Sequence, residues 1–286
     1  MPQDFPKDQI KFNRNRSAAT YNEAAVLQTE VADRLLERLD YMKIDPKVVL
    51  DLGAATGYSL PFLQRRFPKA KVIGVDLSWG LLNRVQQKWW RKKSLKVCAD
   101  KELLPLAANS VDLIYSNLDF YALSDPTLCL QEARRVLKPG GLILFTTFGP
   151  DTLKELRQSF TDAYPHVLEF MDMHHWGDAM LATGWQDPVV DMEFLTLSYS
   201  DLNRLIKDIR GSGAKNIHPE RFPALMPPSR WKAMQESYAK FCFENGQFPA
   251  TFELIYGHAW KTEDKSSAGL NDQGEALIPI QSIRRK

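Results

Sequence analysis

Residues 48–59 read VVLDLGAATGYS and are the most informative segment for the fold of this chain. Three apolar residues run into Asp51, and two glycines, Gly53 and Gly57, then lead into a helical pattern that begins at Leu60. The pattern predicts a buried strand, a tight turn and a helix whose first amide groups are left free. Because glycine has no side chain, such a turn lets a ligand approach the backbone closely. Taken alone, the stretch also fits an ordinary strand–turn–helix unit.

Strand-like and helix-like segments alternate through the first half of the chain. Four further apolar runs of strand length follow the first strand, at residues 70–76, 95–100, 110–117 and 142–148. Helical patterns lie between them, one of them running from Ser78 through Trp90, and another precedes the first strand at residues 17–39. Strands that alternate with helices predict right-handed βαβ units and a parallel sheet covered on both faces.

The second half of the chain has a different pattern, with more helices and a Gly- and Pro-rich loop. Apolar spacing predicts helices at residues 151–163, 174–183, 200–210 and 230–244. Alternation predicts strands at residues 188–199 and 248–260, the second of which has the pattern of an edge strand. Residues 1–11 and the polar stretch 261–286 are expected to be disordered.

Composition limits the possible functions. The 286 residues contain no apolar run long enough to span a membrane, and the N-terminus has no apolar core of a secretory signal. The three cysteines are far apart in sequence, which favours reduced thiols of a cytoplasmic protein and no metal site. A formal net charge of +2 argues against a nucleic-acid partner. We therefore expect a cytoplasmic monomer that binds neither membranes nor nucleic acid.

Polar residues stand at the ends of four expected strands: Asp51, Asp76, Asp100 and Asn117. In open parallel sheets, ligands bind at the carboxyl ends of the strands, where the strand order reverses. The carboxylate of Asp76 can accept hydrogen bonds from both hydroxyls of a ribose, and that of Asp100 can accept one from an adenine amino group. A helix N-cap explains Asp76 alone, but not all four strand ends. The set favours a nucleoside with an aminoacyl tail.

The acid of the first motif precedes the glycines in a D-x-G-x-x-x-G spacing, whereas dinucleotide-binding turns carry G-x-G-x-x-G. Together with GVDLS, ADKELLPL, DLIYSN and RRVLKPGGLILFTTF, this motif resembles the class I S-adenosylmethionine (SAM) methyltransferases. Four flanking stretches are similar to malonyl-[acyl-carrier-protein] O-methyltransferases, which start pimeloyl assembly in biotin synthesis: SAATY (17–21), FGPDTLKELR (148–157), HVLEFMDMHHWGD (166–178) and DIRGSGAKN (208–216). Mitochondrial complex I assembly factors that modify an arginine of a partner protein share much of this flank pattern.

The resemblance implies an α/β fold with a seven-stranded, mostly parallel, doubly wound sheet of the Rossmann-like kind. It also implies SAM as the cofactor, S-adenosylhomocysteine (SAH) as a product, and methyl transfer to the free carboxylate of malonyl acyl carrier protein or malonyl-CoA. The implied parts are a helical lid at residues 1–40, a SAM-binding core at 41–195, a helical acceptor-side insertion at 196–247, the last sheet strand at 248–260 and a disordered tail at 261–286.

The resemblance also implies roles for individual residues. The cofactor-binding residues would be Asp51, Gly53, Ala54, Gly57, Asp76, Leu77, Asp100, Lys101, Asn117 and Leu118. Tyr21 is the expected catalytic lid residue, unless its ring only packs its own helix. Arg157 is the candidate fork for the acceptor carboxylate, and His174 is expected on the acceptor side. For an acidic carrier protein, the expected docking groups are the basic run at 84–96 or Arg204, Lys207 and Arg210.

Two positions depart from the family pattern. Ala55 stands where the family has glycine, and a positive φ there would cost about 1 kcal/mol. Asp119 follows Ser-Asn-Leu at 116–118 and would change the charge near the sulfonium. These departures keep two alternatives open: an enzyme that modifies a side chain of a partner protein, and a non-catalytic assembly protein that keeps the fold.

Overall fold

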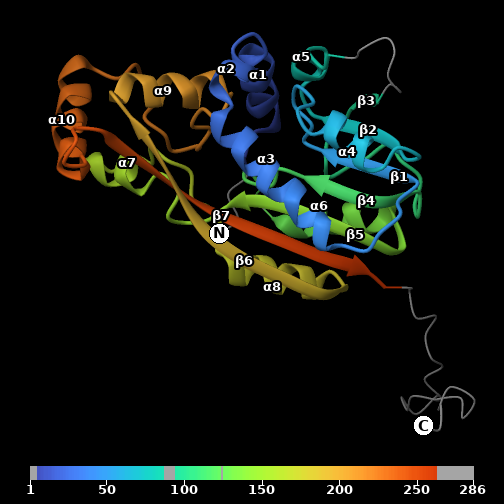
Figure 1. Cartoon of the computed structure of the whole chain (residues 1–286). Helices are drawn as coiled ribbons and strands as arrows, with labels where there is room; N and C mark the ends of the chain where they lie inside the picture. The colour runs from blue at the N-terminus through green and yellow to red at the C-terminus, as the bar shows by residue number, and fades with distance from the viewer. Residues whose placement is uncertain (1–4, 87–93, 124, 263–286) are drawn as a thin grey trace, which may run out of the picture.

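A computed structural model describes residues 5–86, 94–123 and 125–262. These residues form one seven-stranded sheet with the strand order β3-β2-β1-β4-β5-β7-β6 (Figure 1). The strands are β1 Val48–Leu52, β2 Lys71–Asp76, β3 Leu95–Cys98, β4 Val111–Ser116, β5 Leu137–Phe148, β6 Trp185–Tyr199 and β7 Phe248–Lys261. Strands β1 to β5 pair in parallel, and β7 runs antiparallel between β5 and β6. The predicted α/β fold with a mostly parallel seven-stranded sheet is confirmed.

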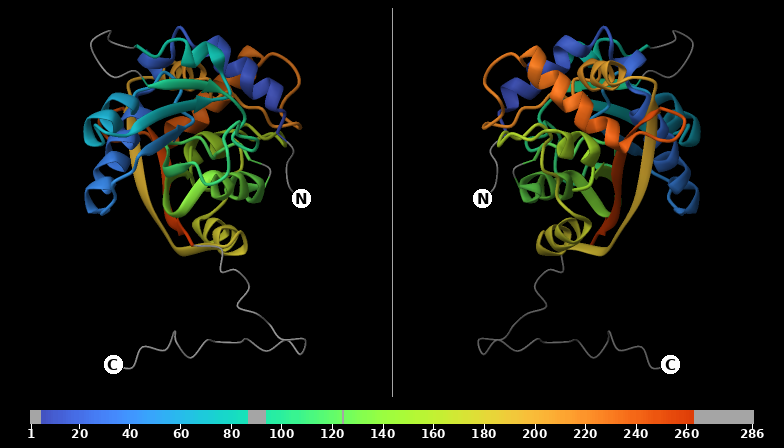
Figure 2. Two further views of the ribbon diagram at one scale, coloured as in Figure 1. Left: turned by 90° about the vertical axis from the view of Figure 1, so that its right-hand side faces the viewer. Right: turned by 90° about the vertical axis from the view of Figure 1, so that its left-hand side faces the viewer.

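Helices cover both faces of the sheet (Figures 1 and 2). On one face, α3 Val26–Arg38 and α4 Leu60–Arg66 bury leucines against β1, β4 and β5. On the other face, α6 Pro126–Val136 and α8 Met173–Ala182 bury Cys129, Leu130, Trp176 and Met180. Burial on both faces explains why the parallel strands read as continuous apolar runs.

Short helices gather beyond the carboxyl ends of the parallel strands. The N-terminal helices α1 Lys7–Ser17 and α2 Tyr21–Ala24 precede α3, and α5 Trp79–Leu82 follows β2. Helix α7 Lys154–Ser159 follows β5, whereas α9 Leu202–Gly211 and α10 Pro228–Tyr238 lie between β6 and β7. Two 3-10 turns, η1 Leu39–Tyr41 and η2 Ala239–Phe241, extend α3 and α10. Because α1 contacts α5 and α2 contacts α9, the N-terminal segment bridges the core and the β6–β7 insertion (Figure 1).

The structure corrects several expected boundaries. Residues 7–11 belong to helix α1, although their polar composition had predicted disorder. Helix α6 ends at Val136 and β5 begins at once, so that Lys138 to Gly141 form part of the strand. Lys261 is a buried residue of β7, whereas residues 263–286 of the expected tail lie outside the described residues. Of the segment from Ser78 through Trp90 that was expected to be one helix, the structure describes residues 78–86, in which α5 covers Trp79–Leu82. Residues 87–90 lie outside the described residues.

Strand β7 is internal, not at the edge as its alternating pattern had predicted. The polar residues that made the pattern alternate, Thr251 and Glu253, are buried and hydrogen-bonded. A carboxylate oxygen of Glu155 accepts a bond from the backbone N–H of Thr251 at 3.1 Å, and Glu253 accepts one from the N–H of Asp151 at 2.7 Å. The edge strand on this side of the sheet is β6, whose residues are mostly half-buried or exposed. None of the helices in the described residues combines the length and apolar character that crossing a bilayer requires.

Candidate active site

The turn after β1 is tied to the neighbouring strand by its backbone. The amide groups of Gly53 and Ala54 both donate to the carbonyl oxygen of Val75 in β2, at 2.8 and 2.9 Å. Gly53 and Gly57 have φ angles of 83° and 80°, a conformation that glycine adopts without strain. A Cβ on Gly53 would lie 2.3 Å from the Cβ of Asp119. The turn therefore requires glycine at the position where its backbone is most closely approached.

Ala55 adopts a left-handed conformation, with a φ of 47°. Its amide donates to Oδ2 of Asp76 at 2.9 Å, which links the turn to the end of β2. For a residue with a Cβ, this conformation costs roughly 1–2 kcal/mol. The departure from glycine at this position thus leaves the turn intact but strained.

Asp51 is a buried acid at the end of β1, with an exposed fraction of 2%. Its Oδ2 has no hydrogen-bond partner among the described residues. Burial and the neighbouring carboxylates of Asp76 and Asp119 raise the pKa of Asp51 to about 8. A positively charged ammonium group beside it would remove this penalty, and the amino-acid tail of SAM carries such a group.

Asp76 accepts hydrogen bonds at the end of β2 from three directions. Its Oδ1 accepts from the amide of Ser78 at 2.8 Å, and its Oδ2 accepts from the amide of Ala55. The same Oδ2 accepts a bond from Nη2 of Arg14 in helix α1, at 2.6 Å. Nη1 of Arg14 donates to Oδ1 of Asp119 at 2.8 Å, so that one buried guanidinium joins two buried carboxylates.

Asp119 is also paired with Lys101, whose Nζ lies 3.2 Å from its Oδ2. Burial alone would raise the pKa of Asp119, but the charges and hydrogen bonds of Lys101 and Arg14 hold it below its usual range. The extra acid at this position is therefore ionised and neutralised locally.

The polar residues at the other two strand ends, Asp100 and Asn117, are also held by hydrogen bonds. Asp100 accepts from the amide of Glu102 at 3.0 Å and pairs with Lys7 of α1 at 2.7 Å. The amide nitrogen of Asn117 donates to the carbonyl of Gln28, and its oxygen accepts from Thr146. Leu118 follows with a φ of 49°, which is uncommon for a branched residue and places strain at the site.

Three adjoining cavities meet at Gly53. The first, of about 990 Å³, lies over the turn and is lined by Asp51, Gly57 and Asn117 among others. The second, of about 40 Å³, lies between Asp76 and Asp100. The third, of about 580 Å³, extends from Gly53 towards α9 and is called the acceptor cavity below. All ten expected cofactor-binding residues line at least one cavity: Asp51, Gly53, Ala54, Gly57, Asp76, Leu77, Asp100, Lys101, Asn117 and Leu118.

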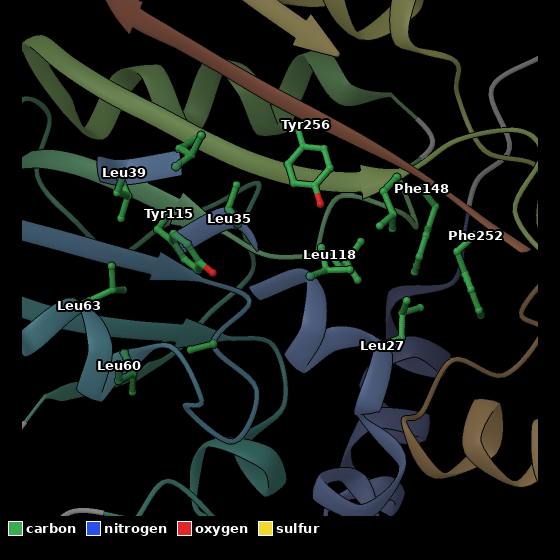
Figure 3. Close-up of a cluster of buried hydrophobic side chains, with 14 of the residues drawn as sticks. Leu27, Leu35, Leu39, Leu60, Leu63, Tyr115, Leu118, Phe148, Phe252 and Tyr256 are labelled. Carbon is green, nitrogen blue, oxygen red and sulfur yellow. The ribbon is translucent and has the colours of Figure 1, made fainter. Parts of the chain in front are cut away.

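The acceptor cavity has an apolar interior and a basic end. Figure 3 shows four of its lining side chains gathered at one end of a buried cluster: Leu27, Leu118, Phe148 and Phe252. The insertion between β6 and β7 contributes three cationic side chains to its lining, Arg210, Lys215 and Arg221, called the basic end below, together with one carboxylate, Asp208. Such a cavity suits a molecule with an apolar or uncharged arm and an anionic group at its outer end.

Tyr21 begins α2 and lines both the cavity over the turn and the acceptor cavity. Burial raises the pKa of its phenol well above the usual range, so that the phenol is a hydrogen-bond donor at neutral pH. The expected lid residue thus lies where a cofactor and an acceptor would meet.

The two residues expected to bind the acceptor lie elsewhere. Arg157 stands behind the cavity wall and donates to the backbone carbonyls of Pro150, Thr152 and Leu168 at 2.7, 3.3 and 3.4 Å. Because Arg157 lines none of the three cavities and donates to the backbone of their wall, it positions that wall and is not brought to the acceptor. His174 is 80% exposed in the first turn of α8, which packs on the opposite face of the sheet.

Arg14 is the residue of this site that the sequence patterns missed. It lines both the small cavity beside Asp76 and the acceptor cavity. No motif includes residues 12–16, and only the packing of α1 on α5 brings this side chain to the strand ends. Of the basic groups expected to dock a carrier, Arg210 lines the acceptor cavity, whereas residues 87–93 of the run at 84–96 lie outside the described residues.

Comparisons with known proteins agree with this geometry. The family model of a methyltransferase domain matches residues 50–145. The *Bacillus subtilis* YcgJ crystal structure covers 81% of this chain and 99% of its own, with a TM-score of 0.58 and 18% identity. A *Haemonchus contortus* phosphoethanolamine N-methyltransferase 2, solved with SAH, covers 81% of this chain and 52% of its own, with a TM-score of 0.50 and 18% identity. Fold and site together define a class I SAM-dependent methyltransferase.

Two relatives show to which family within this class the chain belongs. The malonyl-[acyl-carrier protein] O-methyltransferase 1 of *Coxiella burnetii* is 42% identical over 99% of this chain and 100% of its own length. The malonyl-[acyl-carrier protein] O-methyltransferase of *Gallionella capsiferriformans* is 42% identical over 92% of each chain. The chain therefore belongs to the malonyl-[acyl-carrier protein] O-methyltransferase family.

Proposed function

We propose that this protein transfers the methyl group of SAM to the free carboxylate of a malonyl thioester carried by acyl carrier protein or CoA. The product would be the methyl ester that primes pimeloyl assembly for biotin. One observation carries the proposal: the polar strand ends that suit a nucleoside with an aminoacyl tail open, at Gly53 and Tyr21, into a mostly apolar acceptor cavity.

The residues at the strand ends fit SAM. The unpartnered Oδ2 of Asp51 suits the ammonium of its tail, and the cavity over the turn is lined by the backbone from Gly53 to Gly57, along which the tail would lie. The carboxylate of Asp76 would hold the ribose hydroxyls, and Asp100 would hold the adenine amino group. When bound, SAM supplies a methyl group on a positively charged sulfur.

The proposed reaction requires no general base. A malonyl carboxylate is already ionised at neutral pH, so the protein's part is to align the carboxylate and keep water out. The apolar side chains of Leu27, Leu118 and Phe148 would exclude water from the inner end of the acceptor cavity. Tyr21 would donate a hydrogen bond where the two ligands meet. Because methyl transfer cancels a positive and a negative charge, a dry site favours it.

The basic end of the acceptor cavity supports a carrier as partner. Carrier proteins are acidic, and both a carrier-bound arm and CoA have phosphate near the outer end of the arm. Arg210, Lys215 and Arg221 would face that phosphate, with the thioester arm along the apolar interior.

Calorimetric titration with SAH tests the cofactor half of the proposal. We expect micromolar binding by the wild type, and at least about a hundredfold loss for Asp76→Ala, since two hydrogen bonds to a charged group disappear. The matched control is Asp45→Ala, because Asp45 is 82% exposed, and it should bind as the wild type does. Absence of SAH binding in the wild type would favour a non-catalytic assembly protein.

Methyl transfer to purified carriers tests the acceptor half. We expect ester formation, followed by mass spectrometry, on malonyl acyl carrier protein and on malonyl-CoA, and none on acetyl carrier protein, which has no free carboxylate. An enzyme that binds SAH but leaves both malonyl thioesters unchanged would instead point to modification of a partner protein.

A further inference from the structure

Arg14 occupies the oxygen that a ribose would need. Oδ2 of Asp76 accepts two hydrogen bonds, from Arg14 at 2.6 Å and from the Ala55 amide at 2.9 Å. A carboxylate oxygen has two lone pairs, so this oxygen has no free site while the pair persists. Oδ1 already accepts from Ser78 and has one site left. A diol and Arg14 therefore compete for the same atom.

The space beside Asp76 is also too small for a nucleoside. The cavity that Arg14 and Lys7 of α1 share with Asp76 and Asp100 measures about 40 Å³. At roughly 10–15 Å³ for each water, it holds a few water molecules but no nucleoside. Side chains that α1 contributes to this space, among them Arg14 and Lys7, must therefore move before an adenosine group can bind at the carboxyl ends of β2 and β3.

The other contacts of Arg14 allow an exchange of partners. Its second ion pair, to Asp119, is held by Lys101 from the opposite side and does not involve Asp76. Its Nε is buried and has no partner among the described residues, and its side chain also lines the acceptor cavity. A guanidinium displaced from Asp76 would thus keep Asp119 and have donors free beside the acceptor.

We propose that Arg14 exchanges partners during binding: it closes the ribose site through Asp76, the cofactor displaces it, and the guanidinium, still paired with Asp119, then binds the carboxylate of the acceptor. This assigns to Arg14 the role of a carboxylate fork, because Arg14 lines the acceptor cavity and Arg157 does not. The first step concerns cofactor binding alone, and the second rests on the proposed function. Binding of the two ligands is then ordered, because the fork is released only when the cofactor is in place.

Titration of the full chain with SAH tests the first step without any acceptor. Removing the competitor with Arg14→Met should tighten SAH binding by at least about tenfold. The matched control is Arg16→Met on the same helix, since Arg16 is exposed, and its affinity should stay within about twofold of the wild type. Unchanged or weaker SAH binding by Arg14→Met overturns the inference.

Arg14→Lys gives a second measurement if the methionine variant does not fold. An ammonium keeps the charge but cannot bridge two carboxylates as a planar fork does. We expect Arg14→Lys to bind SAH several-fold more tightly than the wild type does. The change in the logarithm of Kd should be roughly half of that caused by Arg14→Met. An affinity equal to that of the wild type argues against competition at Asp76.

Titration of the SAH complex with malonyl-CoA tests the second step. The wild-type complex should bind malonyl-CoA, and Arg14→Met should lose at least about tenfold in affinity, with partial rescue by Arg14→Lys. Equal binding by wild type and Arg14→Met overturns the role of Arg14 as a fork. No binding by the wild-type complex overturns the proposed acceptor and with it the second step, whereas the SAH titration still decides the first.

Discussion

The strained alanine in the turn after β1 is balanced by the hydrogen bond of its own amide. Ala55 has a φ of 47° and donates to Asp76, a residue that a cofactor would use. Strain of this kind persists only where the surrounding structure holds the backbone in place. The turn is fixed on both sides, by Val75 for the amides of Gly53 and Ala54 and by Asp76 for that of Ala55.

Replacing this alanine by glycine should stabilise the protein. The left-handed conformation costs alanine roughly 1–2 kcal/mol, and glycine avoids this cost. Glycine, however, loses more backbone entropy on folding, which offsets about 0.5–1 kcal/mol of the gain. We expect Ala55→Gly to raise the free energy of unfolding in urea by about 0.5–1 kcal/mol. The control Ala54→Gly has no positive φ to relieve and should lose about 1 kcal/mol. Equal losses in both variants would show that Ala55 is unstrained in solution.

The buried acid Asp51 should make stability fall as the pH rises. Its pKa is about 8 in the folded chain and about 4 in the unfolded chain. Between these values the unfolded state loses its proton and the folded state keeps it, so stability declines with rising pH. Asp51→Asn removes this dependence.

Thermal unfolding at several pH values measures this effect. Near pH 4 the variant Asp51→Asn should resemble the wild type, because both side chains are neutral in the folded state. Near pH 9, above the folded pKa, it should be clearly more stable. The same difference at both pH values would mean that Asp51 titrates normally.

Helix α1 is held to the body of the protein by polar and close-packed contacts. Asn15 accepts hydrogen bonds from the Ser78 hydroxyl and the Gly80 amide, at 2.7 and 2.9 Å. On its other side, α1 packs on the turn after α9, where a Cβ on Gly213 would lie 2.8 Å from Oγ of Ser17. This contact depends on glycine for space as well as for its φ of 80°.

Gly213→Ala should therefore be worse than the same change at a glycine without close neighbours. Gly246 has nearly the same φ, 78°, but a Cβ there would have no neighbour within 4 Å. Backbone strain should cost each variant about 1 kcal/mol, and Gly213→Ala should lose about 1–3 kcal/mol more through overpacking. Urea unfolding compares the two. Equal losses would mean that α1 does not pack on this turn in solution.

The sequence predicted the parallel half of the sheet better than the elements around it. Apolar runs such as 142–148 are local signals, because a strand buried on both faces must be apolar throughout. Helix α1 and the internal position of β7 depend instead on distant partners: Asp76 and Asp119 for Arg14, and Glu155 for Thr251. The motif positions likewise fall along the adjoining cavities at the strand ends, whereas the places of Arg157 and His174 depend on where flanking helices pack.

On the scale of the whole molecule, the acidic strand ends and the basic end line different members of a group of adjoining cavities. Asp51 and Asp76 line the two cavities at the strand ends and suit a cationic cofactor, whereas the basic residues of the insertion line the acceptor cavity. The insertion between β6 and β7 supplies the basic end, and the N-terminal helices lie between α9 of this insertion and α5 of the core (Figure 1). An anionic carrier would be guided to one end only.

Reversing a charge at the basic end should therefore weaken the capture of a carrier without affecting the cofactor. We expect Arg210→Glu to raise KM for malonyl acyl carrier protein by about tenfold at low salt and by less at high salt, since screening removes the lost attraction. SAH affinity should be unchanged. The matched control is Lys232→Glu, because Lys232 is 78% exposed on α10 and lies outside the cavity lining. Equal KM values for both variants at low salt would remove Arg210 from the carrier surface, and a fall in SAH affinity would mean that the reversed charge disturbs the site itself.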